Sequence, residues 1–288
     1  MPKLPGNSRL ISAAGTPLAS LSEINSLPDD EKTAIYGGLL PQRLRLMLGI
    51  DPHNLRKAIH GQLLRIIAPP RLPLVRIEAH QRPNQPPVFF MELSDTPFQQ
   101  IEFGFCIIRD PAAPCFHVDV DTVGRTNWFA TKGRNIPEEI RAMRAGLYPN
   151  QTCHGLRMFG EVLPLVERLT DSLGMEMMVA DLLTYCNAIR YEHYGFSYLN
   201  GMQLMLHINR EFQPGGIFFN RLDGSSPFRM PGMERTVHGR SWAIYDGIMD
   251  EPWNNVKIYK MVGEHAGENT FPDRQRLEEA AYLHQDQA

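Results

Sequence analysis

The spacing of apolar residues changes along the chain, and this change restricts the folds that the chain can adopt. Three early runs are extended or alternate strictly, as strands do: 88–93, 101–108 and 115–121. Two later stretches repeat at helical spacing and end at a glycine: 156–173 and 183–194. Three further short apolar runs are typical of strands: 175–180, 196–199 and 202–208. The order β-β-β-α-β-α-β-β predicts an α/β (α+β) domain with a mixed, mostly antiparallel sheet flanked by helices.

The two ends of the chain differ from this central region. A helix is predicted after Pro28, where acidic residues follow a proline, and a second from Pro52 to just before Pro69. After Phe212 the chain is dense in turn residues, and two strands are expected: 240–245 and 256–262. We therefore expect three parts: a helical N-terminal extension (1–74), a central domain (75–212) and an irregular β-rich C-terminal extension packing on the core (213–288).

Composition excludes several function classes. The 288 residues include 29 basic and 32 acidic side chains, a net charge of −3, so no basic excess favours nucleic acid. No run of about 18 apolar residues predicts a membrane-spanning helix, and residues 1–20 lack the order of a signal peptide. The four cysteines form no CxxC pair, which favours reduced thiols. We expect a cytoplasmic protein that binds neither nucleic acid nor membrane, with a homodimer as one of its allowed states.

The segment from Met177 to Phe196 carries a family pattern. A short strand, Met177-Met178-Val179-Ala180, precedes the run Asn187-Ala188-Ile189-Arg190-Tyr191-Glu192-His193-Tyr194-Gly195-Phe196, in which Tyr191 stands four residues before Gly195. This pattern and the order of elements resemble the GNAT superfamily of acyl-CoA N-acyltransferases over residues 75–212. The resemblance implies a GNAT-like fold that transfers an acyl group, from acetyl-CoA, a longer acyl-CoA or an acyl carrier protein, to a small or amino-acid-like amine. It also implies a role for Asn187 near the cofactor.

Acid and base candidates follow from the same resemblance. A tyrosine on the last turns of a helix can give its phenol proton to a leaving thiolate, which assigns Tyr191 as the general acid; such catalysis contributes about 10²–10⁴-fold. Strict alternation over 115–121 places His117, Asp119 and Asp121 on one face, where one of them could deprotonate the amine. A purely solvated polar face is the alternative for these three residues.

The resemblance further implies a pyrophosphate site at the start of the helix predicted over 156–173. There, backbone N–H groups and the helix dipole would hold phosphate. The candidates are Gln151, Cys153, His154, Gly155 and Arg157. The family spacing is Arg or Gln, two residues, Gly, one residue, then Gly or Ala; only Gln151 and Gly155 fit it, and only approximately, and Phe159 is bulky where the backbone must approach phosphate. This departure keeps open a non-catalytic ligand-binding or scaffold protein on the same fold.

A third alternative is an Fe(II)/2-oxoglutarate oxygenase. His117 and Asp119 have the His-x-Asp spacing that begins a two-His-one-carboxylate iron site, and His238-Gly239-Arg240-Ser241 resembles the downstream part of that family's pattern. The predicted helices between them would interrupt the jelly roll of such enzymes. We therefore expect no metal.

Overall fold

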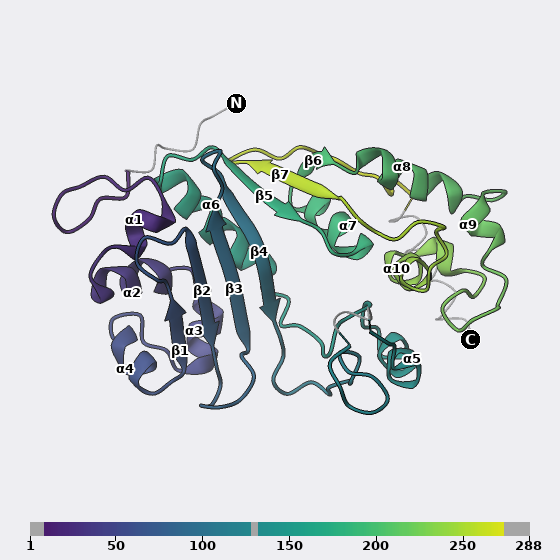
Figure 1. The fold of residues 1–288 in the computed structure, drawn as a ribbon, viewed down its shortest axis with the longest axis horizontal. Helices are drawn as coiled ribbons and strands as arrows, with labels where there is room; N and C mark the ends of the chain where they lie inside the picture. Colours follow the sequence, from purple (N-terminus) through teal and green to yellow (C-terminus); the bar gives the residue numbers. More distant parts are fainter. Residues whose placement is uncertain (1–8, 128–131, 274–288) are drawn as a thin grey trace. The chain divides into compact units, whose positions relative to one another are not determined.

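The structure is a computed structural model that describes residues 9–127 and 132–273 (Figure 1). It is a mixed α/β fold whose seven-stranded sheet has the order β1-β2-β3-β4-β5-β7-β6. The strands are β1 (Leu64–Ile67), β2 (Leu74–Ala79), β3 (Phe89–Asp95), β4 (Ile101–Ile108), β5 (Met177–Asp181), β6 (Ser197–Asn200) and β7 (Lys257–Met261). Strands β1 to β4 pair antiparallel, and β4 pairs with β5 in parallel. The predicted α+β class, with a mostly antiparallel sheet and flanking helices, is confirmed.

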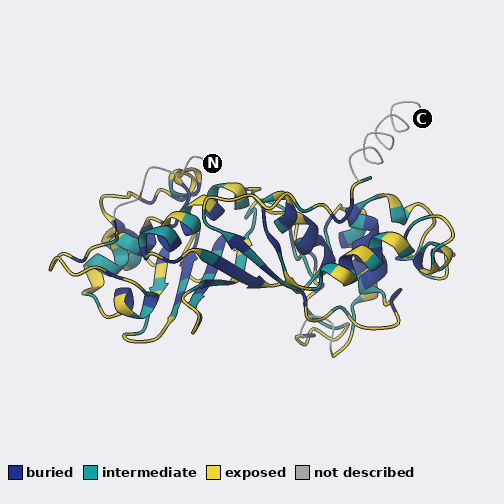
Figure 2. Ribbon diagram, turned by 90° about the horizontal axis from the view of Figure 1, so that it is seen from above, coloured by how far each residue is buried: buried dark blue, intermediate teal, exposed yellow. Residues whose placement is uncertain are grey.

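The chain divides into two compact units. The first unit comprises Met1–Ala112, Gly155–Ala180 and Tyr259–His265, and the second comprises Ala113–His154, Asp181–Ile258 and Ala266–Ala288. Figure 2 shows that buried positions concentrate on the strands and on one side of the helices. Within the described ranges, none of the helices combines the length and the apolar character needed to cross a membrane.

The first unit packs helices against β1 to β4. Its helices are α1 (Leu21–Asn25), α2 (Asp29–Gly37), α3 (Gln42–Leu48), α4 (Leu55–His60) and α6 (Phe159–Ser172). Alternate residues of β3 and the start of β4 are fully buried, and α6 presents Val162 and Val166 to the core. The helix predicted after Pro28 is confirmed as α2. The helix predicted from Pro52 ends early, because Gly61 caps α4 and Gln62 takes a φ of 57°, after which the chain enters β1.

The second unit is mainly helical. Its helices are α5 (Ile136–Arg144), α7 (Tyr185–His193), α8 (Met202–Glu211), α9 (Ile217–Asn220), the 3₁₀ turn η1 (Met233–Arg235) and α10 (Val237–Tyr245). One core cluster joins residues that lie far apart in the sequence: Phe116, Val118, Ala142, Leu147, Phe228 and Trp242. The cluster attaches the segment that precedes His154 to α10.

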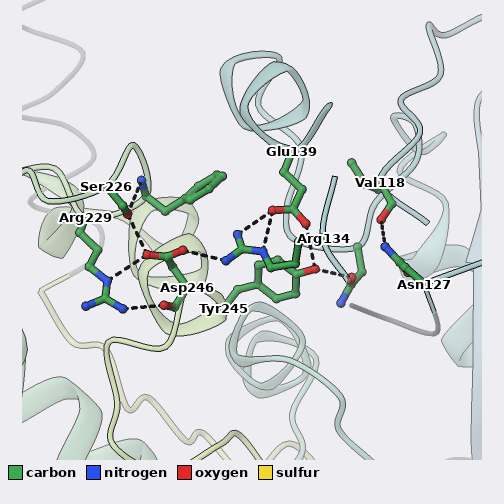
Figure 3. Close-up of polar contacts among 10 residues, drawn as sticks. Val118, Asn127, Arg134, Glu139, Ser226, Arg229, Tyr245 and Asp246 are labelled. Atoms are coloured by element: carbon green, nitrogen blue, oxygen red, sulfur yellow. Dashed lines mark hydrogen bonds and ion pairs between the residues drawn. The ribbon is translucent and has the colours of Figure 1, made fainter. Parts of the chain in front are cut away.

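A charged network stabilises this attachment (Figure 3). Arg134 donates to the Glu139 carboxylate at 2.6 and 2.9 Å and to Asp246 at 2.8 Å, and its guanidinium lies 4.8 Å from the Tyr245 ring centroid. Arg229 also donates to Asp246, at 2.9 Å. Burial lowers the pKa of Arg134, but the hydrogen bonds and charges of its two carboxylate partners outweigh this effect and raise it. The guanidinium therefore stays charged and joins α5 to α10.

The prediction of a strand is wrong for three segments. Residues 115–121 form an irregular segment, and residues 202–208 and 240–245 belong to helices α8 and α10. The C-terminal region expected to be β-rich accordingly contains helices α9 and α10 beside strand β7 in its described part. The strands expected at 88–93, 101–108, 175–180, 196–199 and 256–262 are confirmed as β3, β4, β5, β6 and β7 within a few residues.

Candidate functional site

Strands β4 and β5 separate after a short parallel contact in the first unit. Their register contains two pairs, Ile101 with Met178 and Glu102 with Val179. Beyond these pairs, Phe103–Ile108 continues along β3. The burial of β4 changes at the same point, from alternately buried positions to half-buried and exposed ones over residues 104–108. Six of the eight residues of β4 therefore lie outside its register with β5.

A β-bulge explains the separation. The register of β4 on β3 jumps from Phe105 opposite Glu92 to Phe103 opposite Leu93, which leaves Gly104 as the extra residue. A bulge bends the strand and increases its local twist, and bulges are over-represented next to active sites. Because β4 bends at Gly104, it turns away from β5 where the pairing ends.

After the bulge, the peptide groups of Ile108 point to the edge of β4 that lies opposite β3. The Arg109 N–H donates to Val88 O at 2.9 Å, so in an antiparallel ladder the peptide groups of Ile108 face the opposite edge. There Ile108 O accepts the Leu156 N–H at 3.2 Å, and Gly155 forms a bridge with Arg109.

A glycine is required at position 155, beside the backbone of β4. A Cβ on Gly155 would lie 2.7 Å from Ile108 O, which is shorter than real contacts of this kind. The glycine predicted to approach phosphate thus approaches the backbone of β4. Phe159, predicted to obstruct the phosphate site, packs its ring on Phe103 of β4 with centroids 5.8 Å apart. The aromatic ring is therefore engaged by the sheet.

Positive side chains surround the loop that leads into α6. Arg43 of α3 donates to Leu156 O at 2.5 Å and pairs with Glu161 of α6 at 3.1 Å. Arg157 is exposed and has a φ of 55°, and Arg109 holds Gly155 through its backbone. No side chain caps the start of α6. Guanidinium groups beside a helix N-terminus form a site that suits phosphate.

In the second unit, Tyr191 lies at the C-terminal cap of α7. The Phe196 N–H donates to Tyr191 O at 3.1 Å and the Gly195 N–H to Glu192 O at 2.9 Å, while Gly195 has a φ of 84°. These bonds define a Schellman cap, in which a hydrophobic contact commonly joins the first and last residues. That contact is the edge-to-face packing of the Tyr191 and Phe196 rings, 4.9 Å apart. The helix end predicted at this glycine is confirmed.

The three predicted base residues occupy an irregular segment of the second unit. His117 and Asp119 are exposed, and the backbone of His117 is held by Glu138 and Asn135 of the α5 region. Asp121 accepts the backbone N–H groups of Val123 and Arg125 and the Arg125 guanidinium. The Arg125 N–H above all, opposed in part by burial, holds the pKa of Asp121 below its ordinary value.

The predicted cofactor residues are divided between the units. Gly155 and Arg157 lie in the first unit; Gln151, Cys153, His154 and Asn187 lie in the second. Gln151 accepts the Tyr148 N–H at 2.9 Å, and His154 Nε2 lies 2.9 Å from Ala145 O. Cys153 is buried, and Asn187 is half-buried on α7. The Phe116 N–H donates to Thr152 O at 2.7 Å, so the structure brings the His117 segment beside the Gln151–His154 loop.

The residues considered for iron binding do not converge. Among the described residues, no three His, Cys, Asp or Glu side chains are arranged to hold a metal ion. The Nε2 atom of His238 lies 2.9 Å from Leu147 O, and burial lowers the pKa of His238 more than this contact raises it. His238 therefore belongs to the core around Trp242.

Sequence reasoning missed part of this site. Arg43 is not among the site residues expected from the sequence, yet it contacts a loop 113 residues away. No local pattern encodes that contact, because it depends on how α3 packs in the first unit. The Gly104 bulge was also missed, although an isolated glycine inside a strand pattern is a known signal for one.

Comparisons with protein-family models, curated proteins and solved structures find no match to this chain.

Proposed function

We propose that the protein transfers an acyl group from acyl-CoA, or from a carrier-bound thioester, to a small amine. The observation that carries the proposal is the early end of the β4–β5 pairing: the parallel register stops after Glu102, just before the Gly104 bulge. A pantetheine arm has two amide groups, and an open strand edge binds such a chain by β-augmentation. CoA and acyl carrier proteins share this arm.

The loop before α6 supports a phosphate-bearing donor. Arg43 and Arg157 supply guanidinium groups next to the N-terminus of α6, which favours anions. The glycine spacing of GNAT enzymes is incomplete here, and we propose that these arginines take over part of the phosphate binding. Arg43 uses two of its nitrogens for Leu156 O and Glu161, and a guanidinium has five N–H donors. It therefore retains donors for a phosphate.

In the proposed reaction, the amine nitrogen attacks the thioester carbonyl carbon and forms a C–N bond. When the tetrahedral intermediate collapses, the C–S bond breaks, and the leaving thiolate takes the phenol proton of Tyr191. A base removes the proton that the nitrogen loses. The carboxylate of Asp121 already accepts hydrogen bonds from the turn that follows it. We therefore assign the role of base to His117 or Asp119. The proposal includes a cytoplasmic location, where acyl-CoA is present and where cysteines stay reduced; none of the four cysteines forms a disulfide.

Ligand binding tests the proposal first. Acetyl-CoA, a longer acyl-CoA and acetyl-pantetheine are compared by thermal shift; a ligand at 100 times its Kd adds about 2.7 kcal/mol of stability. Arg43→Ala should weaken acetyl-CoA binding by about 10-fold or more, since a charge-assisted hydrogen bond is worth about 1.5–3 kcal/mol, and should leave acetyl-pantetheine unchanged. Arg65→Ala is the matched control, because Arg65 is similarly exposed (58% against 56%) and also pairs with one carboxylate. Equal effects of the two variants would contradict the phosphate site.

Turnover tests the acid. Tyr191→Phe should lower kcat by about 10²-fold or more at an unchanged Kd for acyl-CoA, whereas Tyr194→Phe on the same helix should keep its rate. Binding of acyl-CoA without transfer to any amine would favour the non-catalytic alternative. Full activity of Tyr191→Phe would refute the role of this residue.

A further inference from the structure

A segment near the C-terminus crosses the cap of α7 in the second unit. We call residues Ala266–Phe271 the strap. The Ala266 N–H donates to Gly195 O at 3.1 Å, and the Ser197 hydroxyl donates to Glu268 at 2.8 Å. Further along, Thr270 contacts Glu192 of α7. The strap therefore contacts the last turn of α7 and the residues that follow it.

Glu192 is the centre of this contact. Glu192 is 4% exposed, and its carboxylate accepts three hydrogen bonds. The Thr270 hydroxyl donates at 2.6 Å, the Thr270 N–H at 3.1 Å and the Tyr198 hydroxyl at 2.5 Å. Burial, and then the charge of Glu192, raise the pKa of Tyr198, so Tyr198 remains a donor. A buried carboxylate needs such donors, because leaving it without them is costly.

The same cap holds Tyr191. The Tyr191 carbonyl accepts the Phe196 N–H, the Tyr191 ring packs on Phe196, and the neighbouring carbonyl of Glu192 accepts the Gly195 N–H. The strap reaches this cap at two points, through Gly195 O and through the Glu192 carboxylate. Fraying of the last turn would release both the backbone and the ring of Tyr191, since helix ends without such partners open readily.

We propose that Glu192 is a positioning residue for Tyr191, and that it acts by latching the strap through Thr270. This inference rests on the proposed function of Tyr191 as the general acid. The latch fixes the α7 cap and thereby the direction of the Tyr191 phenol. It contributes to kcat and leaves acyl-CoA binding unchanged, because the phosphate and pantetheine contacts lie on other elements.

Hydrogen exchange of the intact protein tests the latch without any turnover. Thr270→Val removes the hydroxyl bond to Glu192 and keeps the N–H bond, so protection of the Gly195 and Phe196 amides should fall by about 10-fold. Thr270→Ser should restore it. Thr170→Val is the matched control, because Thr170 is also buried and its hydroxyl donates to Val166 O within α6. Unchanged protection in Thr270→Val, or equal loss in both valine variants, would overturn the latch.

Kinetics test the positioning. Thr270→Val should lower kcat by about 10-fold at an unchanged KM for acyl-CoA, with rescue by Thr270→Ser and a larger loss in Glu192→Gln. A fall in exchange protection at full kcat would overturn the positioning role, as would a kcat effect matched by Thr170→Val. If the wild-type protein transfers no acyl group while the exchange results hold, the proposed function fails and the latch stands. The two failures are thus distinguishable.

Discussion

Removing Arg134 should show how the second unit is held together. Glu139 is 1% exposed, and apart from Arg134 its carboxylate receives the Tyr245 hydroxyl at 3.4 Å, a long contact. Asp246 is better protected, because Arg229 and the Ser226 hydroxyl donate to it at 2.9 and 2.7 Å. In Arg134→Met the loss of stability therefore comes mainly from the buried Glu139 carboxylate, which is left without its ion-pair partner. We expect a loss of about 4 kcal/mol in the free energy of unfolding, since breaking a buried ion pair from one side costs about 3–5 kcal/mol.

The reverse change should cost less. In Glu139→Leu, Arg134 keeps Asp246 and the faces of Phe228 and Tyr245, and its side chain is 25% exposed, so we expect a loss of about 3 kcal/mol. The double variant leaves no unpaired charge. Its loss should reflect one hydrogen bond to Asp246, the cation–π contacts and imperfect packing, about 4 kcal/mol together. The coupling energy of the pair is then about 3 kcal/mol.

Urea unfolding followed by tryptophan fluorescence measures this cycle, because Trp242 is fully buried and stacks on Phe228 of the same cluster. The control is the more exposed pair of Lys257 and Asp181, 3.3 Å apart, whose coupling should stay below about 1 kcal/mol. If Arg134 and Glu139 couple by less than about 1 kcal/mol, the network does not act as a unit and the reasoning from burial is wrong.

Two further predictions concern local chemistry. The pKa of Asp121 is lowered in the folded state, so the stability that Asp121 gives its turn is present above the unfolded pKa, about 3.9, and is lost as pH falls through the folded value. Exchange of the Arg125 amide should therefore accelerate only below about pH 4, and Asp121→Ala should show the fast rate at pH 7. A thiol reagent should modify exposed Cys115 first and Cys186 only after unfolding, because burial raises the pKa of the Cys186 thiol. Rapid labelling of Cys186 in native protein, identified by peptide mapping, would contradict its burial.

The elements that sequence predicted best have one periodicity and a clear end. The helix now seen as α6 carries a long apolar stripe, and β3 and β4 are bounded by turn residues, so propensity and packing agree there. The apolar run that begins at Met202 fits both the helical and the strand periodicity. Its structure buries Met205 and Ile208 and exposes Leu206, which is helical spacing. For α10 a signal was present, since the Thr236 hydroxyl accepts the Gly239 N–H as an N-cap.

Residues 115–121 were wrongly predicted as a strand because buried and exposed side chains alternate there although the backbone is irregular. Phe116 and Val118 are buried and His117 and Asp119 are exposed, so these two lie on one side as expected, whereas Asp121 is half-buried. The backbone groups, however, do not form a ladder. Val118 O accepts the Asn127 side chain at 2.7 Å, and the His117 N–H donates to Glu138 at 3.0 Å. Every buried backbone group needs a partner, but the sequence pattern does not state whether that partner is a strand or a side chain.

The same distinction separates the predictable part of the site from the rest. Tyr191 and its cap are local: a tyrosine, a glycine four residues later and a phenylalanine next to it determine the Schellman geometry that the structure contains. The early end of the β4–β5 pairing, by contrast, lies beside a register jump opposite Glu92. The partners of the loop and the cap, Arg43 and Thr270, come from 113 and 78 residues away. Such contacts follow from the packing of whole elements, so the proposed acid could be chosen from sequence, whereas the groups that we propose to bind the donor and to position the acid could not.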